Sequence, residues 1–158
     1  MQIRPFRPTD ADALADLFHA SVREAGIRDY SSEQVAAWSP VRPDPARYLQ
    51  QAENRTFLVA VDELDQPIGY GDLEPDGHID HLYCHPERVG TGVGAALYKA
   101  LEATAQDKGI PRLFVEASEA ARRMFARYGF QIDGRQEFVR NGVLIHNYRM
   151  SKRLSSGG

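Results

Sequence analysis

Residues 85–95 read His85-Pro86-Glu87-Arg88-Val89-Gly90-Thr91-Gly92-Val93-Gly94-Ala95, and they form the most informative segment of this 158-residue chain. Three glycines at alternate positions allow a tight turn whose amides point the same way. The pattern predicts a helix immediately afterwards, and the first amides of a helix lack internal partners. Turn and helix together predict a phosphate or pyrophosphate site, to which Arg88 adds positive charge. A glycine turn without a ligand is the alternative, but one glycine would suffice for it.

The glycine pattern also matches other phosphate-binding sequences. A P-loop is excluded, because no Lys-Ser/Thr pair follows the glycines. A dinucleotide fold is the stronger rival, since residues 90–95 satisfy G-x-G-x-x-A and Glu116 ends the next predicted strand. Against it, residues 85–89 separate the glycines from the preceding strand. Too little chain follows to build the second half of such a sheet.

Hydrophobic periodicity and turn residues predict an α+β (mixed α/β) fold around this segment. Ser31 with Gln34 forms a capping-box pattern, and Asn141-Gly142 is a strong hairpin signal. The predicted strands span 3–6, 56–61, 68–73, 78–84, 112–116, 130–140 and 143–150. The predicted helices span 10–24, 31–38, 45–51, 93–108 and 119–127. This order implies a sheet that is parallel across one strand–helix–strand crossover and antiparallel elsewhere.

Composition excludes several classes of protein. The chain is 42% hydrophobic and 26% charged, so it is not a disordered or fibrous sequence. The apolar runs are too short to span a membrane, and the first residues do not resemble a signal peptide, which favours a cytoplasmic location. A net charge of −3 argues against general nucleic-acid binding. With Cys84 as the single cysteine, no disulfide forms within the chain.

Taken in order, these features resemble the GNAT N-acetyltransferase superfamily. Its acetyl-CoA-binding motif is Gln/Arg-x-x-Gly-x-Gly/Ala, and Gly92 and Gly94 match the two small positions. Residues 82–86 resemble the strand end before that motif. Residues 118–130, which include Ala121, resemble the family's later helix. Tyr30-Ser31, Trp38 and residues 147–150 are similar to a bacterial subgroup whose acceptor is unassigned.

The resemblance implies a single N-acetyltransferase domain over residues 1–150 and a flexible tail over 151–158. In the family, a mostly antiparallel sheet of about seven strands opens between its fourth and fifth strands, with helices on both faces. Pantetheine pairs with the strand edge inside that opening. The resemblance therefore implies acetyl-CoA as cosubstrate, no metal, and these cofactor-binding residues: Leu82, Tyr83, Cys84, Arg88, Val89, Gly90, Thr91, Gly92, Val93, Gly94, Ala95, Ser118, Ala121 and Phe125.

Two positions depart from the family pattern. The Gln/Arg position falls on Val89, although backbone amides can still hold a pyrophosphate. The tyrosine that usually protonates the leaving thiolate falls on Phe125, which has no proton to donate. Tyr128 lies one helical turn later and is the candidate replacement. Water is the other proton source, and a packing role for Tyr128 is the simpler alternative.

Acetyl transfer to an amine needs a group that takes the proton of the ammonium. Asp80 is the first candidate base, His81 the second and Glu116 the third. Regular strand alternation would place Asp80 and His81 on opposite faces of the sheet, and likewise His78 and His81. One metal ion could then not collect both histidines, so no metal site is predicted. Cys84 has no evident base beside it and is expected to be a buried structural thiol.

The sequence as a whole predicts an N-acetyltransferase that acts by direct attack of a primary amine on acetyl-CoA. The acceptor is a small molecule or a protein amine, and neither nucleic acid nor membrane is expected as a partner. Eight acidic residues against Arg55 within residues 53–80 favour a cationic acceptor. The oligomeric state, a homodimer included, stays open. The alternatives are a non-catalytic acyl-CoA sensor and a dinucleotide-dependent oxidoreductase. Candidate walls of the acceptor pocket are Tyr30, Trp38, Tyr48, Phe138 and His146.

Overall fold

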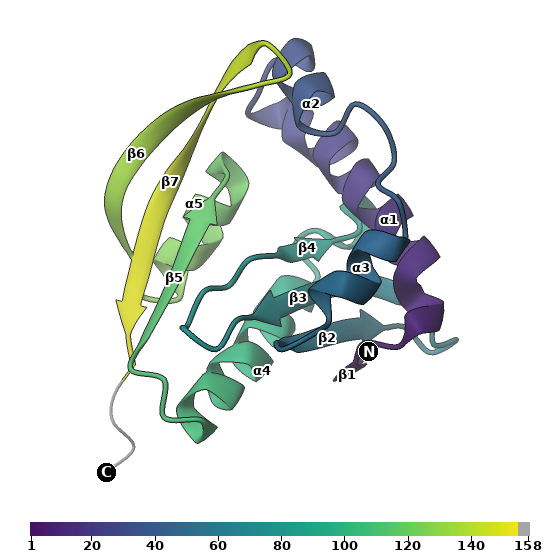
Figure 1. Ribbon diagram of the computed structural model, residues 1–158, viewed down its shortest axis with the longest axis vertical. Helices are drawn as coiled ribbons and strands as arrows, with labels where there is room; N and C mark the ends of the chain where they lie inside the picture. The colour runs from purple at the N-terminus through teal and green to yellow at the C-terminus, as the bar shows by residue number, and fades with distance from the viewer. Residues whose placement is uncertain (155–158) are drawn as a thin grey trace.

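The computed structural model describes residues 1–154 and contains two antiparallel sheets that diverge from one another (Figure 1). The first sheet has the order β1-β2-β3-β4, with β1 (Gln2–Pro5), β2 (Thr56–Val61), β3 (Pro67–Leu73) and β4 (Leu82–Cys84). The second has the order β5-β7-β6, with β5 (Arg112–Ala117), β6 (Gln131–Arg140) and β7 (Val143–Arg153). A parallel bridge from His78 to Phe114 joins them. The predicted opening between the fourth and fifth strands is confirmed.

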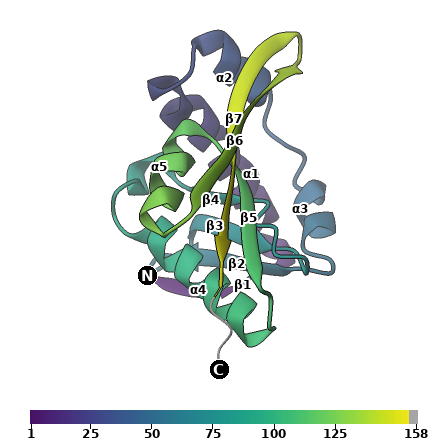
Figure 2. The same ribbon diagram turned by 90° about the vertical axis from the view of Figure 1, so that its left-hand side faces the viewer.

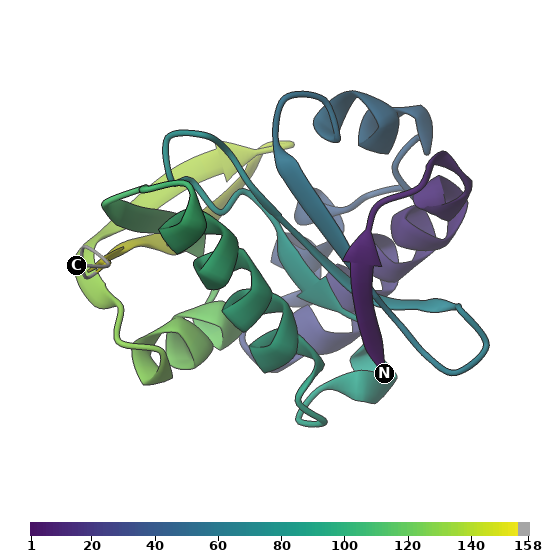
Figure 3. The same ribbon diagram turned by 90° about the horizontal axis from the view of Figure 1, so that it is seen from below.

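Helices cover both faces of the first sheet and one face of the second. They are α1 (Ala11–Ala20), α2 (Ser32–Trp38), α3 (Ala46–Gln51), α4 (Val93–Asp107) and α5 (Glu119–Arg127). In the view from below, α4 lies on one side of the first sheet and α1 and α3 on the other (Figure 3). The second sheet is seen nearly edge-on in Figure 2, with α5 against one face. Within residues 1–154, no helix has the length and apolar character that a membrane crossing requires.

The central helix α4 approaches β3 closely because two glycines face it. A Cβ atom on Gly69 would lie 2.8 Å from Val93 Cγ1 of α4, and one on Gly71 would lie 3.1 Å from Leu101 Cδ1 of the same helix. Leu97 and Leu101 of α4 are fully buried in this contact. The start of the helix, which carries the predicted phosphate site, is thereby fixed relative to β4.

Local sequence signals predicted several elements correctly. The Ser31 hydroxyl accepts a hydrogen bond from the Gln34 amide at 3.1 Å, and the Gln34 side chain caps the Ser31 amide at 3.0 Å. Asn141 and Gly142 both have positive φ, as the two-residue hairpin turn between β6 and β7 requires. These signals depend on neighbouring residues alone, so they can be read from the sequence.

Three predicted boundaries are wrong. The first helix does not run regularly to Glu24: α1 ends at Ala20 and continues as a π turn over Ser21–Ala25. Residues 151–153 belong to β7 and not to the tail, because they pair with residues 112–114 of β5. Residues 155–158 of the predicted tail lie outside the described residues. The strand predicted over 78–84 is regular only over Leu82–Cys84.

Candidate active site

Among residues 1–154, the strand edges that line the opening between the sheets have no neighbouring strand. Asp72 N donates to His81 O at 3.0 Å and His85 N donates to Ile68 O at 2.9 Å, so odd-numbered residues of this segment bond to β3. By alternation, the peptide groups of Leu82 and Cys84 face the opening. In β5, the backbone of Phe114 bonds to residues 77 and 79. By the same alternation, the peptide groups of Glu116 also face the opening. Both edges offer backbone donors and acceptors to an extended ligand.

The glycine turn leaves a group of backbone amides without partners. Gly90 and Gly92 have φ values of +80° and +92°, which curl the chain before α4. Thr91 N donates to Arg88 O at 3.1 Å, and Ala96 N is the first amide to bond within the helix start, to Gly92 O at 3.0 Å. Within the described part of the chain, no backbone acceptor is found for the amides of Gly90, Gly92, Val93, Gly94 and Ala95. Such a group of amides at a helix N-terminus suits a pyrophosphate.

The side chains around the turn are mostly exposed. Arg88 lies 4.0 Å from Asp62, a weak surface pair that leaves its guanidinium accessible. Val89, at the family's Gln/Arg position, is 49% exposed. A hollow of about 370 Å³ lies beside Arg88, and another of about 230 Å³ lies beside Val89. The turn is thus open to a ligand from solvent, with one cation at its edge.

The start of α5 is the second helix N-terminus at the opening. Ser118 caps it by accepting from the Ala121 amide at 3.3 Å. Phe125 is 3% exposed and packs in the core between α4 and α5, with its ring 4.9 Å from that of Phe130. Tyr128 stacks on Tyr98 of α4 at 4.5 Å. Burial raises the pKa of Tyr128, so the phenol keeps its proton at neutral pH.

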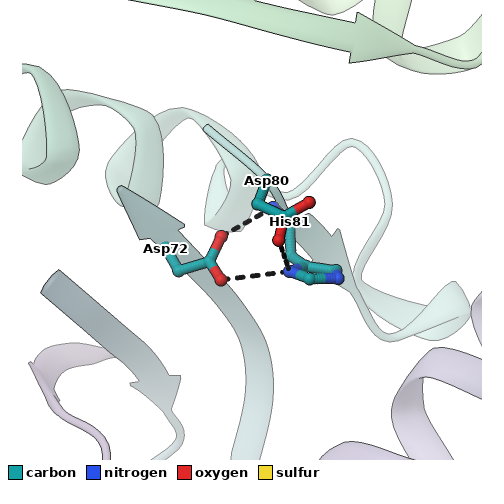
Figure 4. Close-up of side chains that lie close together, drawn as sticks. All are labelled: Asp72, Asp80 and His81. Carbon is teal, nitrogen blue, oxygen red and sulfur yellow. Dashed lines mark hydrogen bonds and ion pairs between the residues drawn. The ribbon is translucent and has the colours of Figure 1, made fainter. Parts of the chain in front are cut away.

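A β-bulge before β4 brings two of the predicted catalytic residues together. Asp72 N donates to His81 O, and Glu74 N donates to His78 O. Residues 78–81 thus lie opposite residues 72–74, so one extra residue is inserted opposite β3 in the chain before β4. The bulge turns Asp80 to the side of His81, and Asp80 Oδ2 lies 3.5 Å from His81 Nδ1 (Figure 4). The prediction that the two side chains point to opposite faces is therefore wrong. Regular alternation does not hold across an inserted residue.

The sequence did not identify Asp72 as part of this site. It is fully buried near the end of β3, and its Oδ2 lies 3.0 Å from His81 Nδ1. Arg55 balances the charge, with Nη1 at 2.9 Å from Asp72 and 3.0 Å from Asp80. Glu74 is a further 3.8 Å from the same guanidinium. Part of the acidic stretch over 53–80 is therefore already paired inside the protein.

Glu116 lies in a different cluster, at the joint between the sheets. His78 Nε2 is 2.5 Å from Glu116 and His78 Nδ1 is 2.7 Å from Glu74. Burial opposes protonation of His78, but the hydrogen bonds that its ring donates to Glu116 and Glu74 outweigh this and raise the pKa of His78 above the usual value. With a carboxylate at each ring nitrogen, His78 holds the joint together, and both of its nitrogens are engaged in hydrogen bonds within the protein.

Some of these side chains come close enough to share a cation. Asp72, Asp80 and His81 form one such group, and Glu74, His78 and Asp80 form another. No single group contains both His78 and His81 among the described residues. The guanidinium of Arg55 already contacts Asp72, Asp80 and Glu74, so a metal ion would have to displace it. The absence of a metal site remains a prediction from the sequence.

A third polar cluster lies where α5 begins and β7 passes it. Glu119 Oε1 accepts from His146 Nε2 and from the Tyr148 hydroxyl, each at 2.7 Å. The Tyr30 hydroxyl accepts from the Glu119 amide at 3.0 Å and donates to His146 O at 3.2 Å. Tyr30 and His146, both predicted pocket walls, therefore meet here. Tyr48, another predicted wall, is fully buried in the core.

Because of Glu119, the free energy of unfolding should decrease as the pH falls through the acidic range. Burial opposes its ionisation, but hydrogen bonds from His146, Tyr148 and Arg122 outweigh this and lower its pKa from 4.5 to about 2. This stabilisation is complete above the unfolded-state pKa and is lost as the pH falls toward the folded-state value. We expect Glu119→Gln to lower the free energy of unfolding by about 2 kcal/mol at pH 7, and by much less near pH 2.

Urea denaturation of the wild type and Glu119→Gln across this pH range tests the prediction. Glu53→Gln, at an exposed site, is the matched control and should shift stability little at any pH. A difference between Glu119→Gln and the wild type that stays constant down to pH 2 would contradict the assignment.

Comparison with known proteins identifies the family. The model of the acetyltransferase (GNAT) domain matches residues 27–152. An uncharacterised N-acetyltransferase of Escherichia coli, YafP, is 31% identical over 150 residues, which cover 95% of this chain and 94% of YafP. A solved GCN5-related N-acetyltransferase from Rhodopseudomonas palustris is 36% identical, with a TM-score of 0.88 over 97% of this chain and 95% of that one. The chain belongs to the GNAT acetyltransferase family, as the resemblance in its sequence predicted.

A more distant structure shares the fold alone. It is a phosphinothricin acetyltransferase of the GNAT superfamily from Sinorhizobium meliloti, solved in complex with AcCoA. Its sequence identity is 20% and its TM-score 0.77, over 99% of this chain and 89% of that one. The two proteins thus share their overall fold although most of their residues differ.

Proposed function

We propose that this protein transfers an acetyl group from acetyl-CoA to the primary amine of a small molecule or protein. The group of unpartnered amides at the start of α4 carries the proposal. It follows β4 after an intervening segment of residues 85–89, and the edge of β4 at Leu82 and Cys84 has no neighbouring strand among the described residues. A pyrophosphate on the amides and a pantetheine along that edge would place the thioester in the opening between the sheets. The AcCoA complex of the S. meliloti structure supports the donor.

The chemistry needs only groups that the site provides. The ammonium of the acceptor gives one proton to a base, for which we propose His81 Nε2. The freed lone pair attacks the thioester carbon, a C–N bond forms and the C–S bond breaks. The amine nitrogen then loses a second proton to water, and the departing thiolate takes one proton either from water or from Tyr128, whose phenolate water then reprotonates. Asp80 is bound to Arg55 and Glu116 to His78, so neither is as free to accept a proton.

Two measurements test the proposed function. Calorimetry should show CoA binding to the wild-type protein and no comparable binding of NAD(H). Acetyl-CoA with a panel of cationic, neutral and acidic amines should release free thiol and acetylated amine in equal amounts. CoA binding without thiol release for any amine would instead favour the acyl-CoA sensor. NAD(H) binding without CoA binding would favour the oxidoreductase.

A further inference from the structure

Asp72 is held in an unusual way for a carboxylate inside a sheet. In a regular antiparallel pair, opposite residues exchange both backbone hydrogen bonds. Here Asp72 N donates to His81 O at 3.0 Å, but His81 N donates to the Asp72 carboxylate, at 2.7 Å from Oδ1. The Asp72 side chain replaces the backbone acceptor that the bulge removes. The Asp72 carboxylate therefore contacts both the backbone amide and the imidazole ring of His81.

The second oxygen of Asp72 is directed at the ring of His81. Oδ2 lies 3.0 Å from His81 Nδ1 and accepts from Arg55 Nη1 at 2.9 Å. An ionised carboxylate in the sheet interior is tolerated only when donors satisfy it, and each of these partners can donate. Within the described residues, no hydrogen-bond partner is found for His81 Nε2.

We propose that Asp72 is a positioning residue for His81: it holds the proton on Nδ1 and leaves Nε2 free to take a proton from the amine. The inference rests on the proposed acetyl transfer for its role in catalysis. A carboxylate that accepts from one ring nitrogen fixes both the tautomer and the orientation of the imidazole. Asp72 itself does not touch the substrate.

Other groups around the ring set its electrostatic environment. Asp80 Oδ2 lies 3.5 Å from Nδ1 on the loop before β4. Arg55 reaches both carboxylates from the chain segment before β2 and offsets their charge beside the imidazole. The rings of Tyr70 and Tyr83 each lie 6.3 Å from that of His81. The site therefore combines two acids and one permanent cation with two aromatic neighbours.

The tautomer of His81 can be measured directly in the wild-type protein. Nitrogen-15 NMR of the His81 ring, assigned by comparison with His81→Gln, reports which nitrogen carries the proton in the neutral imidazole. We expect a protonated Nδ1 and an unprotonated Nε2. A neutral ring with its proton on Nε2 would overturn the inference, whatever the activity of the protein.

Asp72→Asn tests the consequence for catalysis. The amide oxygen would keep accepting from the His81 amide, so its NH2 group would face Nδ1 and favour the other tautomer. We expect kcat/KM at neutral pH to fall at least about 100-fold, with a changed pH profile. CoA affinity should stay within about twofold of the wild-type value, because the amides of the glycine turn are untouched. A fall of less than about threefold with an unchanged pH profile would overturn the inference.

Asp76→Asn is the matched control for this variant. Asp76 is exposed in the turn between β3 and the bulge, where it accepts from the His78 amide at 3.1 Å. Its activity and His81 NMR signals should match those of the wild type. If no amine is acetylated by any form, the proposed function fails while the NMR result still decides the tautomer. If acetylation occurs with the opposite tautomer, the inference fails and the proposed function stands.

Discussion

Gly92→Glu is expected to lower the affinity for CoA at least about 100-fold, which corresponds to roughly 2.7 kcal/mol. Gly92 has a φ of +92°, and a Cβ atom there would meet no atom of another part of residues 1–154 within 4 Å. The new carboxylate would therefore extend into the open space over the free amides. It would compete with the pyrophosphate for these donors and repel its charge. Isothermal titration calorimetry with CoA measures the effect.

Gly109→Glu is the matched control for this experiment. Gly109 follows the opposite end of α4 and has a φ of +71°, and a Cβ atom at this position would likewise have no neighbour within 4 Å among the described residues. Both variants introduce the same charge and a similar backbone strain, about 1–2 kcal/mol. They should lose similar stability, but only Gly92→Glu should lose CoA binding. Equal CoA affinities in the two variants would contradict the assignment of the glycine turn.

Gly77→Ala should destabilise the protein by more than about 3 kcal/mol. Gly77 has a φ of +99°, and a Cβ atom would lie only 2.1 Å from the carbonyl oxygen of Arg112. Gly77 O also accepts from Phe114 N at 3.1 Å, at the point where the two sheets join. A methyl group there would push the joint apart, since the backbone of β5 cannot move away independently.

Urea denaturation of Gly77→Ala beside Gly109→Ala measures this effect. The control has a similar φ but open space around its Cβ, so it should lose only about 1 kcal/mol. Amide hydrogen exchange at Phe114 should accelerate in Gly77→Ala, because that amide donates across the joint. Equal losses of stability in the two variants would show that backbone strain, and not the contact with Arg112, limits this position.

The order of elements was predictable because its signals are local. Capping residues, the Asn141-Gly142 turn and the alternation of apolar residues each act within a few positions of the chain. The glycine turn is also a local signal. Its free amides could be predicted because the next helix begins immediately after it, and the first amides of a helix have no partner within the helix. The family motif and these local signals together sufficed for the fold.

The arrangement of Asp72, Asp80 and His81 was not predictable in this way. The bulge that turns Asp80 toward His81 exists only in the pairing with β3, and the sequence of residues 78–84 reads as an ordinary strand. Burial of Asp72 is explained only once Arg55 is known to lie beside it. One signal was present: Gly69 and Gly71 alternate with Tyr70 and Asp72, which places Asp72 on the same buried face as Tyr70.

The β6–β7 hairpin is fastened to α2, far away in the sequence. Asn141 Nδ2 donates to Ala37 O at 2.7 Å, and Gln34 Nε2 donates to Leu144 O at 3.0 Å. If the acceptor binds on this side of the opening, residues 30–38 and 138–146 enclose it as one unit. Evolution toward a new acceptor would then require paired substitutions in both segments, and a library that randomises only one should yield few altered specificities.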